Sequence, residues 1–165
     1  MFFSCSVTSV EANIEIKSPE FKSEDMMPAK YTCDGGNFSP PLSWDGIPKD
    51  AKSLVLICDD PDAPMGTWVH WLIYNMPPAS KGLQEGVLPV ESFSHDTKQG
   101  INDFKEIGYG GPCPPSGVHR YFFKLYALDS KLNLPAGATK KELLVAMKEH
   151  ILAQAEMIGK YEKRK

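Results

Sequence analysis

Hydrophobic residues gather in three segments of the chain, and each has the spacing of a β-strand. Residues 53–58 form an unbroken apolar run, which is typical of a central strand covered on both faces. Residues 67–75 and 118–128 are rich in β-branched and aromatic side chains, and a two-residue period divides each between two faces. Isoleucines that alternate with polar residues at positions 14 and 16 predict a further short strand.

The two-residue period makes a specific prediction about the second of these strands. It places His70 on the face of Trp68, Leu72 and Tyr74, and it places Trp71 on the opposite face. We therefore expect the histidine and the neighbouring tryptophan to point to different sides of the sheet.

One helix is predicted near the C-terminus. Thr139 followed three residues later by Glu142 forms a capping box, the usual signature of a helix N-terminus. The apolar positions that follow have helical spacing and predict one buried stripe, made of Leu143, Leu144, Met147, Ile151 and Ala155. From residue 156 onward the pattern fits either a continuation of the helix to Gly159 or a final edge strand.

Composition supports a β-rich chain of one domain. The 165 residues include 14 prolines and 13 glycines, which lie outside the apolar runs and favour short strands joined by turns. We expect a tail over residues 1–12 and a single domain over residues 13–165. Because 18 basic residues face 21 acidic ones, the chain has no basic excess with which to bind a phosphate backbone. Nucleic acid is therefore disfavoured as a partner.

The N-terminal segment bears on localisation. No apolar stretch approaches the roughly 20 residues that cross a bilayer, and residues 1–10 lack the basic start of a signal peptide. We therefore expect a cytoplasmic protein without a transmembrane segment. Cys5 lies unusually close to the start, which leaves open a removed leader and a periplasmic or secreted protein.

The four cysteines give no metal-binding pattern. None forms a Cys-x-x-Cys pair or a spacing typical of zinc sites, so no metal is expected, and Cys58 ends an apolar run as a small buried residue. Cys33 and Cys113 both lie in turn-like segments. In an oxidising compartment a disulfide between them would close a loop of about 80 residues and stabilise the fold by a few kcal/mol, whereas in a reducing cytoplasm it should not form.

Two polar segments next to predicted strands carry the candidate chemistry. Residues 59–64 hold three carboxylates in four positions, and two prolines stiffen this loop at the end of a buried strand. On the last of the three strands, His119 and Tyr121 share a face. The Gly/Pro-rich residues 110–117 directly before them allow backbone N–H groups to approach a ligand closely.

Taken together, these segments resemble the phosphatidylethanolamine-binding protein family, which includes the Raf kinase inhibitor proteins. The resemblance rests on DPDAP, WVHW and the Gly/Pro loop running into HRY, while TCDGGNFSPPLSW, HRYFFKLYALD and ILAQAEMIGKYEK resemble its shorter prokaryotic branch. It implies a mostly β fold, an antiparallel β-sandwich with an α-helix in the C-terminal region and small peripheral helices. It also implies a pocket for phosphate-like anions, formed by Asp60, Asp62, Pro64, His70, Gly111, His119 and Tyr121.

Members of that family bind phospholipid headgroups or phosphoryl ligands and inhibit kinases or proteases. The resemblance therefore implies a small phosphorylated ligand or phospholipid headgroup as a partner, with a kinase or protease as a protein partner, and leaves a homodimer open. In such a pocket, Asp60 or Asp62 would orient an imidazole of His70 or His119 and favour its cationic form, which donates to phosphate. Tyr121 and N–H groups near Gly111 would supply further donors.

The alternative is a metal-assisted phosphoester hydrolase, in which the two histidines and two aspartates hold a metal that activates water. The chain has no His-Glu-x-x-His pair, no Gly-x-Ser-x-Gly motif, and neither a P-loop nor a dinucleotide fingerprint. We therefore expect a binding protein with no catalytic residues and no cofactor.

Overall fold

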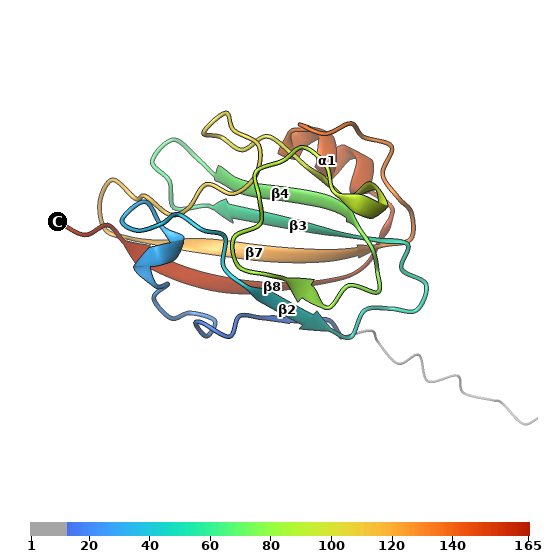
Figure 1. Ribbon diagram of the computed structural model, residues 1–165, viewed down its shortest axis with the longest axis horizontal. Helices are drawn as coiled ribbons and strands as arrows, with labels where there is room; N and C mark the ends of the chain where they lie inside the picture. The colour runs from blue at the N-terminus through green and yellow to red at the C-terminus, as the bar shows by residue number, and fades with distance from the viewer. Residues whose placement is uncertain (1–12) are drawn as a thin grey trace, which may run out of the picture.

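The computed structural model describes residues 13–165, and the tail expected over residues 1–12 lies outside the described part. Two antiparallel sheets dominate the fold, and Figure 1 shows the long strands side by side. The larger sheet has five strands, in the order β6 (Lys98–Gln99), β4 (Trp68–Met76), β3 (Ser53–Asp60), β7 (Val118–Leu128) and β8 (Ile151–Glu162). The smaller sheet consists of β1 (Glu15–Lys17), β2 (Leu42–Asp45) and β5 (Gly82–Leu83).

Helical structure is scarce in the described residues. It comprises one α-helix, α1 (Lys140–Met147), and two single-turn 3₁₀ helices, η1 (Ala29–Tyr31) and η2 (Ser94–Asp96). This arrangement confirms the predicted mostly β, antiparallel sandwich with one helix near the C-terminus.

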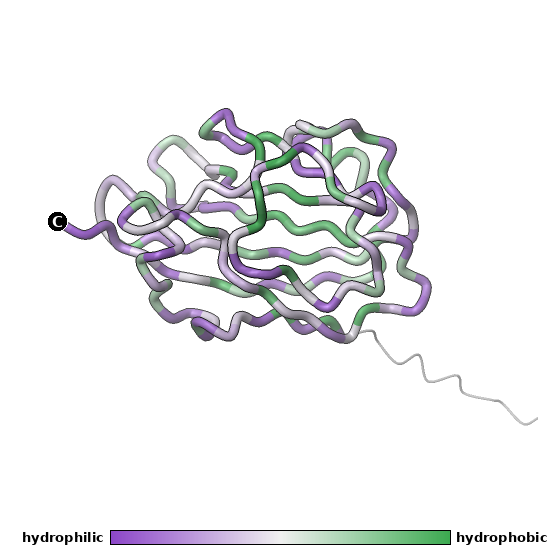
Figure 2. Tube along the Cα trace, in the orientation of Figure 1, coloured by the Kyte–Doolittle hydropathy of each residue, from purple (hydrophilic) through white to green (hydrophobic). Residues whose placement is uncertain are grey.

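The larger sheet is covered on both faces, as the unbroken apolar run of its central strand predicted. All eight residues of β3 are buried. On one face, Trp71 and Phe123 pack against Trp44 of the smaller sheet. On the other face, Leu72 packs in a second cluster with Leu143 of α1. Figure 2 shows the corresponding concentration of hydrophobic residues along the central strands.

The helix begins where the sequence predicted and ends earlier. Thr139 and Glu142 form the full capping box, but α1 ends at Met147 and Glu149 adopts a positive φ of 70°. The prediction of a helical stripe through Ile151 and Ala155 was therefore wrong, because both residues lie in strand β8. Residues 153–161 also have apolar or small side chains at alternate positions, and pairing along the whole of β7 satisfies that two-residue period. Of the two alternatives for the C-terminal segment, the edge strand is the correct one.

Candidate functional site

A cavity of about 220 Å³ lies at one end of the larger sheet, where β3 ends and β4 and β7 begin. Antiparallel pairing of β3 with both neighbours brings these three strand ends together, although β7 begins far from the other two in sequence. The lining residues are Asp60, Ala63, Pro64, Trp68, His70, Phe104, Cys113, Pro114, Pro115, His119 and Tyr121. Five of the seven residues predicted for the anion pocket are therefore in its lining, and Asp62 and Gly111 are not.

Asp60 and His119 form a buried hydrogen-bonded pair in the cavity wall. The Nδ1 of His119 lies 2.7 Å from the Oδ2 of Asp60, and the two residues are 7% and 3% exposed. The other carboxylate oxygen of Asp60 accepts the backbone N–H of Asp62 at 2.7 Å. Because an ionised carboxylate can only accept, Nδ1 of His119 carries the proton. This bond fixes the ring orientation and leaves Nε2 as the nitrogen that a ligand can reach.

His70 reaches the cavity through a β-bulge. The pairing of β3 with β4 shifts by one residue between Cys58 opposite Trp71 and Asp59 opposite Val69, so that His70 is the extra residue of the strand. Leu72 and Trp71 keep to opposite faces, but the bulge turns His70 toward the face of Trp71. The strict two-residue period, which put His70 opposite Trp71, was wrong at this position.

The tautomer of His70 follows from its surroundings. Its Nδ1 lies 2.5 Å from the carbonyl oxygen of Gly110, which can only accept, so Nδ1 is protonated. Burial lowers the pKa of His70 below the ordinary value of 6.5, and the bond to Gly110 opposes that effect only in part. The ring is therefore neutral at pH 7, and its Nε2 offers a lone pair. The expectation that His70 would act as a cation is not supported by this environment.

Aromatic rings surround the two histidines. The ring of His70 meets Tyr121 edge to face at 5.0 Å between centroids and Phe104 at 5.4 Å. Phe104 in turn meets Trp68 at 5.4 Å. Burial, and secondarily the charge of Asp60, raises the pKa of Tyr121 above its ordinary value, so its hydroxyl keeps its proton and can donate. The indole N–H of Trp68 is buried and has no hydrogen-bond partner among the described residues.

The two predicted residues outside the lining have other partners. Asp62 binds Arg120 through Nε at 2.9 Å, Nη2 at 2.8 Å and the backbone N–H at 3.0 Å. These bonds lower the pKa of Asp62 to about 2. The N–H of Gly111 donates to Oδ1 of Asn37 at 2.8 Å, so it is not available to a ligand. A Cβ at this position would clash with Asn37 and with the Tyr31 carbonyl, which explains the glycine.

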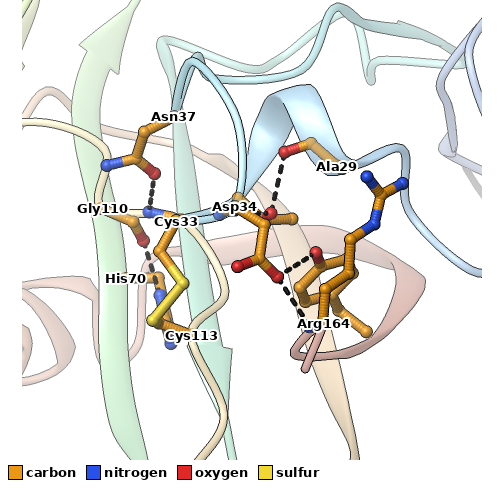
Figure 3. Close-up of a disulfide and its surroundings, with 11 residues drawn as sticks. Ala29, Cys33, Asp34, Asn37, His70, Gly110, Cys113 and Arg164 are labelled. Atoms are coloured by element: carbon orange, nitrogen blue, oxygen red, sulfur yellow. Dashed lines mark hydrogen bonds between the residues drawn. A yellow bond between two sulfur atoms is a disulfide. The ribbon is translucent and has the colours of Figure 1, made fainter.

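A disulfide borders the cavity. The structure joins Cys33 to Cys113 across 80 residues, with 5.4 Å between their Cα atoms. Figure 3 shows it beside the hydrogen bond from His70 to Gly110 and the bond that Asn37 accepts. Sequence reasoning did not name Asn37, Gly110, Phe104 or Trp68 as site residues. Trp68 was placed only on the face of His70, and Gly110 only in the Gly/Pro-rich loop. Asn37 and Phe104 lie in loops without a periodic pattern.

Another cavity within the described residues is a weaker candidate for the functional site. A larger cavity of about 420 Å³ lies under the loop that follows β4. Its two ionisable lining residues, Glu85 and His95, form no bond with each other, and Glu85 is engaged by Lys30 and Tyr31. We therefore place the site in the smaller cavity, where polar groups converge. Within residues 13–165, no three His, Cys, Asp or Glu side chains are grouped as metal ligands.

Comparison with known proteins assigns the family. The family model for phosphatidylethanolamine-binding protein matches residues 17–162. A UPF0098 protein of Methanothermobacter thermautotrophicus is 55% identical over 148 residues, which cover 90% of this chain and 98% of the relative. A UPF0098 protein of Aquifex aeolicus is 48% identical over 155 residues, covering 92% of this chain and 90% of the relative. The chain belongs to the phosphatidylethanolamine-binding protein family and to its shorter prokaryotic branch.

Two solved structures are similar to the whole described fold. A phosphatidylethanolamine-binding protein homologue from Chlamydia trachomatis superposes with a TM-score of 0.85 at 44% identity, covering 93% of this chain and 99% of that one. Escherichia coli YbcL, a member of the mammalian phosphatidylethanolamine-binding protein family, superposes with a TM-score of 0.83 at 31% identity. The match covers 92% of this chain and 99% of that one. As to the membrane, residues 13–165 include no helix with the length and apolar character needed to cross one.

Proposed function

We propose that the cavity binds a small phosphate-type monoanion that brings one hydrogen-bond donor of its own. The observation that carries the proposal is the contrast between the two histidines. Asp60 orients His119 so that Nε2 of its imidazolium form donates to an anionic oxygen. His70 is held neutral with its Nε2 lone pair available, so it accepts a hydrogen bond from a hydroxyl or ammonium group of the ligand. A pocket with both groups suits an anion that is itself partly protonated.

The small positive charge of the lining limits the negative charge that the bound anion can carry. Of the described residues, no lysine or arginine lines the cavity, and the imidazolium of His119 is balanced by Asp60. The remaining attraction comes from a neutral donor, the hydroxyl of Tyr121. A singly charged phosphate monoester with one hydroxyl, or a phosphate headgroup with an ammonium group, satisfies these groups. A polyanion would meet too little positive charge.

We further propose that the phosphate group enters as part of a larger molecule, a phospholipid or a protein partner such as a kinase or protease, whose activity the protein regulates. Exposed apolar side chains around the mouth support this. Met65, which follows Pro64 of the lining, is 96% exposed. Val118, which precedes His119 of the lining, is 50% exposed. Phe104, which lines the cavity, is 40% exposed. A phosphoserine peptide should then bind more tightly than free phosphoserine, and equal affinities would contradict this finer proposal.

Calorimetric titration tests the anion site itself. Inorganic phosphate and phosphoethanolamine should bind at one site, sulfate should bind more weakly because it brings no donor, and His119→Ala should remove binding. His150→Ala is the matched control, because that histidine pairs with Asp129 at the opposite end of β7. Equal binding by the wild type and the His119 variant would overturn the proposal. Hydrolysis of a phosphate ester on addition of a divalent metal would favour the hydrolase instead.

A further inference from the structure

One wall of the cavity is an irregular segment that depends on a distant loop for its position. Residues 109–117 contain neither helix nor strand. They are fastened to residues 29–37 by the Cys33–Cys113 disulfide and by the bond from the Cys33 N–H to the Pro112 carbonyl, at 3.1 Å. Figure 3 shows the disulfide of this junction beside His70.

Two further hydrogen bonds complete the junction. The Gly111 N–H donates to Asn37 at 2.8 Å, and the hydroxyl of Tyr109 donates to the Tyr31 carbonyl at 2.7 Å. The wall is therefore held from across the chain rather than by its own secondary structure.

This wall supplies both shape and chemistry to the site. Cys113, Pro114 and Pro115 line the cavity directly. Gly110, three residues before the cysteine, provides the carbonyl that holds His70 in its Nδ1-protonated tautomer. A shift of the wall would change the volume of the cavity and release the ring that offers the acceptor nitrogen.

We propose that the Cys33–Cys113 disulfide positions the anion pocket, so that reducing it to two thiols weakens ligand binding while the sheets stay folded. The proposal rests on the anion site proposed above. A dithiol reductant supplies two electrons and two protons, the sulfur–sulfur bond breaks, and the reductant becomes a cyclic disulfide. Cys33 is exposed, so a reductant can reach the bond.

The effect should be local because the bond lies outside both hydrophobic clusters. Neither cysteine belongs to the cores that hold the two sheets and α1 together. Reduction leaves the wall with three hydrogen bonds to residues 29–37, besides the two that join Gly110 to His70, and a ligand must then order the rest of it on binding. Such an ordering cost should lower the affinity by about tenfold. The wall of the pocket is consequently held in position in an oxidising compartment, and the pocket binds its ligand more weakly in a reducing one.

Titration of inorganic phosphate into oxidised and dithiothreitol-reduced protein tests the proposal. Thiol counting under denaturing, non-reducing conditions first verifies the bond, because the oxidised chain should show two thiols fewer than the reduced one. We expect about tenfold weaker binding after reduction, with an unchanged circular dichroism spectrum. The control is the double variant Cys33→Ser/Cys113→Ser, whose weak binding should not respond to dithiothreitol. Equal affinity in both redox states would overturn the proposal.

A second measurement does not depend on ligand. Nitrogen-15 spectra of the His70 ring should report the Nδ1-protonated tautomer in the oxidised protein and a changed mixture after reduction. A general loss of stability would lower the unfolding temperature without altering this ring in the folded state. If neither redox state binds phosphate, the anion site itself fails. If the His70 spectrum is the same in both states, the positioning role fails even where binding is observed.

Discussion

Replacing Asp60 with asparagine should change His119 from a charged donor into a neutral one. The asparagine oxygen can keep accepting the Asp62 N–H, bound at 2.7 Å, but its amide NH₂ then faces Nδ1 of His119, also at 2.7 Å. Two donors would oppose each other unless Nδ1 loses its proton and Nε2 carries it instead. His119 is then confined to a neutral form that still donates from Nε2.

The size of the effect follows from the loss of a charge-assisted bond. Such a bond between groups as buried as these contributes about 1.5–3 kcal/mol. The unfolding free energy in urea should therefore fall by about 2 kcal/mol. Affinity for sulfate should fall by about tenfold rather than vanish, because a neutral donor remains. His119→Ala, which removes the donor, should bind less than Asp60→Asn.

Calorimetry with sulfate separates this mechanism from a simple loss of stability. Sulfate stays a dianion near neutral pH, so any change in its affinity reports on the protein. Asp60→Asn should bind sulfate more weakly than the wild type and more tightly than His119→Ala. A variant with wild-type affinity would refute the assignment of Asp60 and His119 to the anion site.

Two further predictions concern ionisable groups whose pKa is shifted. Arg120 lowers the pKa of Asp62 from 3.8 to about 2, so this carboxylate stabilises the fold above about pH 4 and stops doing so as the pH falls through 2. Asp62→Asn should cost about 1 kcal/mol in urea at pH 7 and leave phosphate affinity unchanged, and a large loss of affinity would place Asp62 in the site. Burial depresses the pKa of His70 below 6.5, so its neutral form favours folding above that pH and stability is lost as the pH falls through the depressed value. Unfolding free energies between pH 7.5 and 5 should therefore drop more in the wild type than in His70→Asn, and parallel curves would contradict this.

The strands could be predicted from the sequence because their signals are local. The apolar run at residues 53–58 and the segment at residues 118–128 correspond to β3 and β7. The pattern of apolar residues in each segment directly reflects burial on one or both faces. The end of the helix could not be predicted, because residues 151 and 155 fit a helical stripe and an alternating strand equally well. Pairing with β7, a long-range interaction, decides between the two.

The site shows the same division between local and long-range causes. Asp60 and His119 were identified because carboxylates at a strand end and a histidine on a strand face are visible in the sequence. The orientation of His70 was not, because a bulge depends on the register between two strands. Asn37 was missed because its partner Gly111 is 74 positions away, and no pattern around either residue signals the bond.

The two adjacent aspartates at the end of β3 show why placement decides the role of a residue. Successive residues of a strand point to opposite faces, so Asp59 faces the layer of α1 and Asp60 faces the cavity. Asp59 is only 1% exposed and is paired with Lys140 at 2.7 Å and Lys124 at 3.2 Å. Two lysines give it permanent positive partners, which suits a structural role.

Asp60 has no lysine or arginine partner among the described residues, and its side chain binds His119 and one backbone N–H. Its side-chain partner is therefore an imidazole that itself lines the cavity. In the proposed function, this pairing orients His119 for the bond that it donates to the anion. The alternation of faces directs Asp59 to the layer of α1 and Asp60 to the cavity, which agrees with the resemblance that named Asp60 and not Asp59.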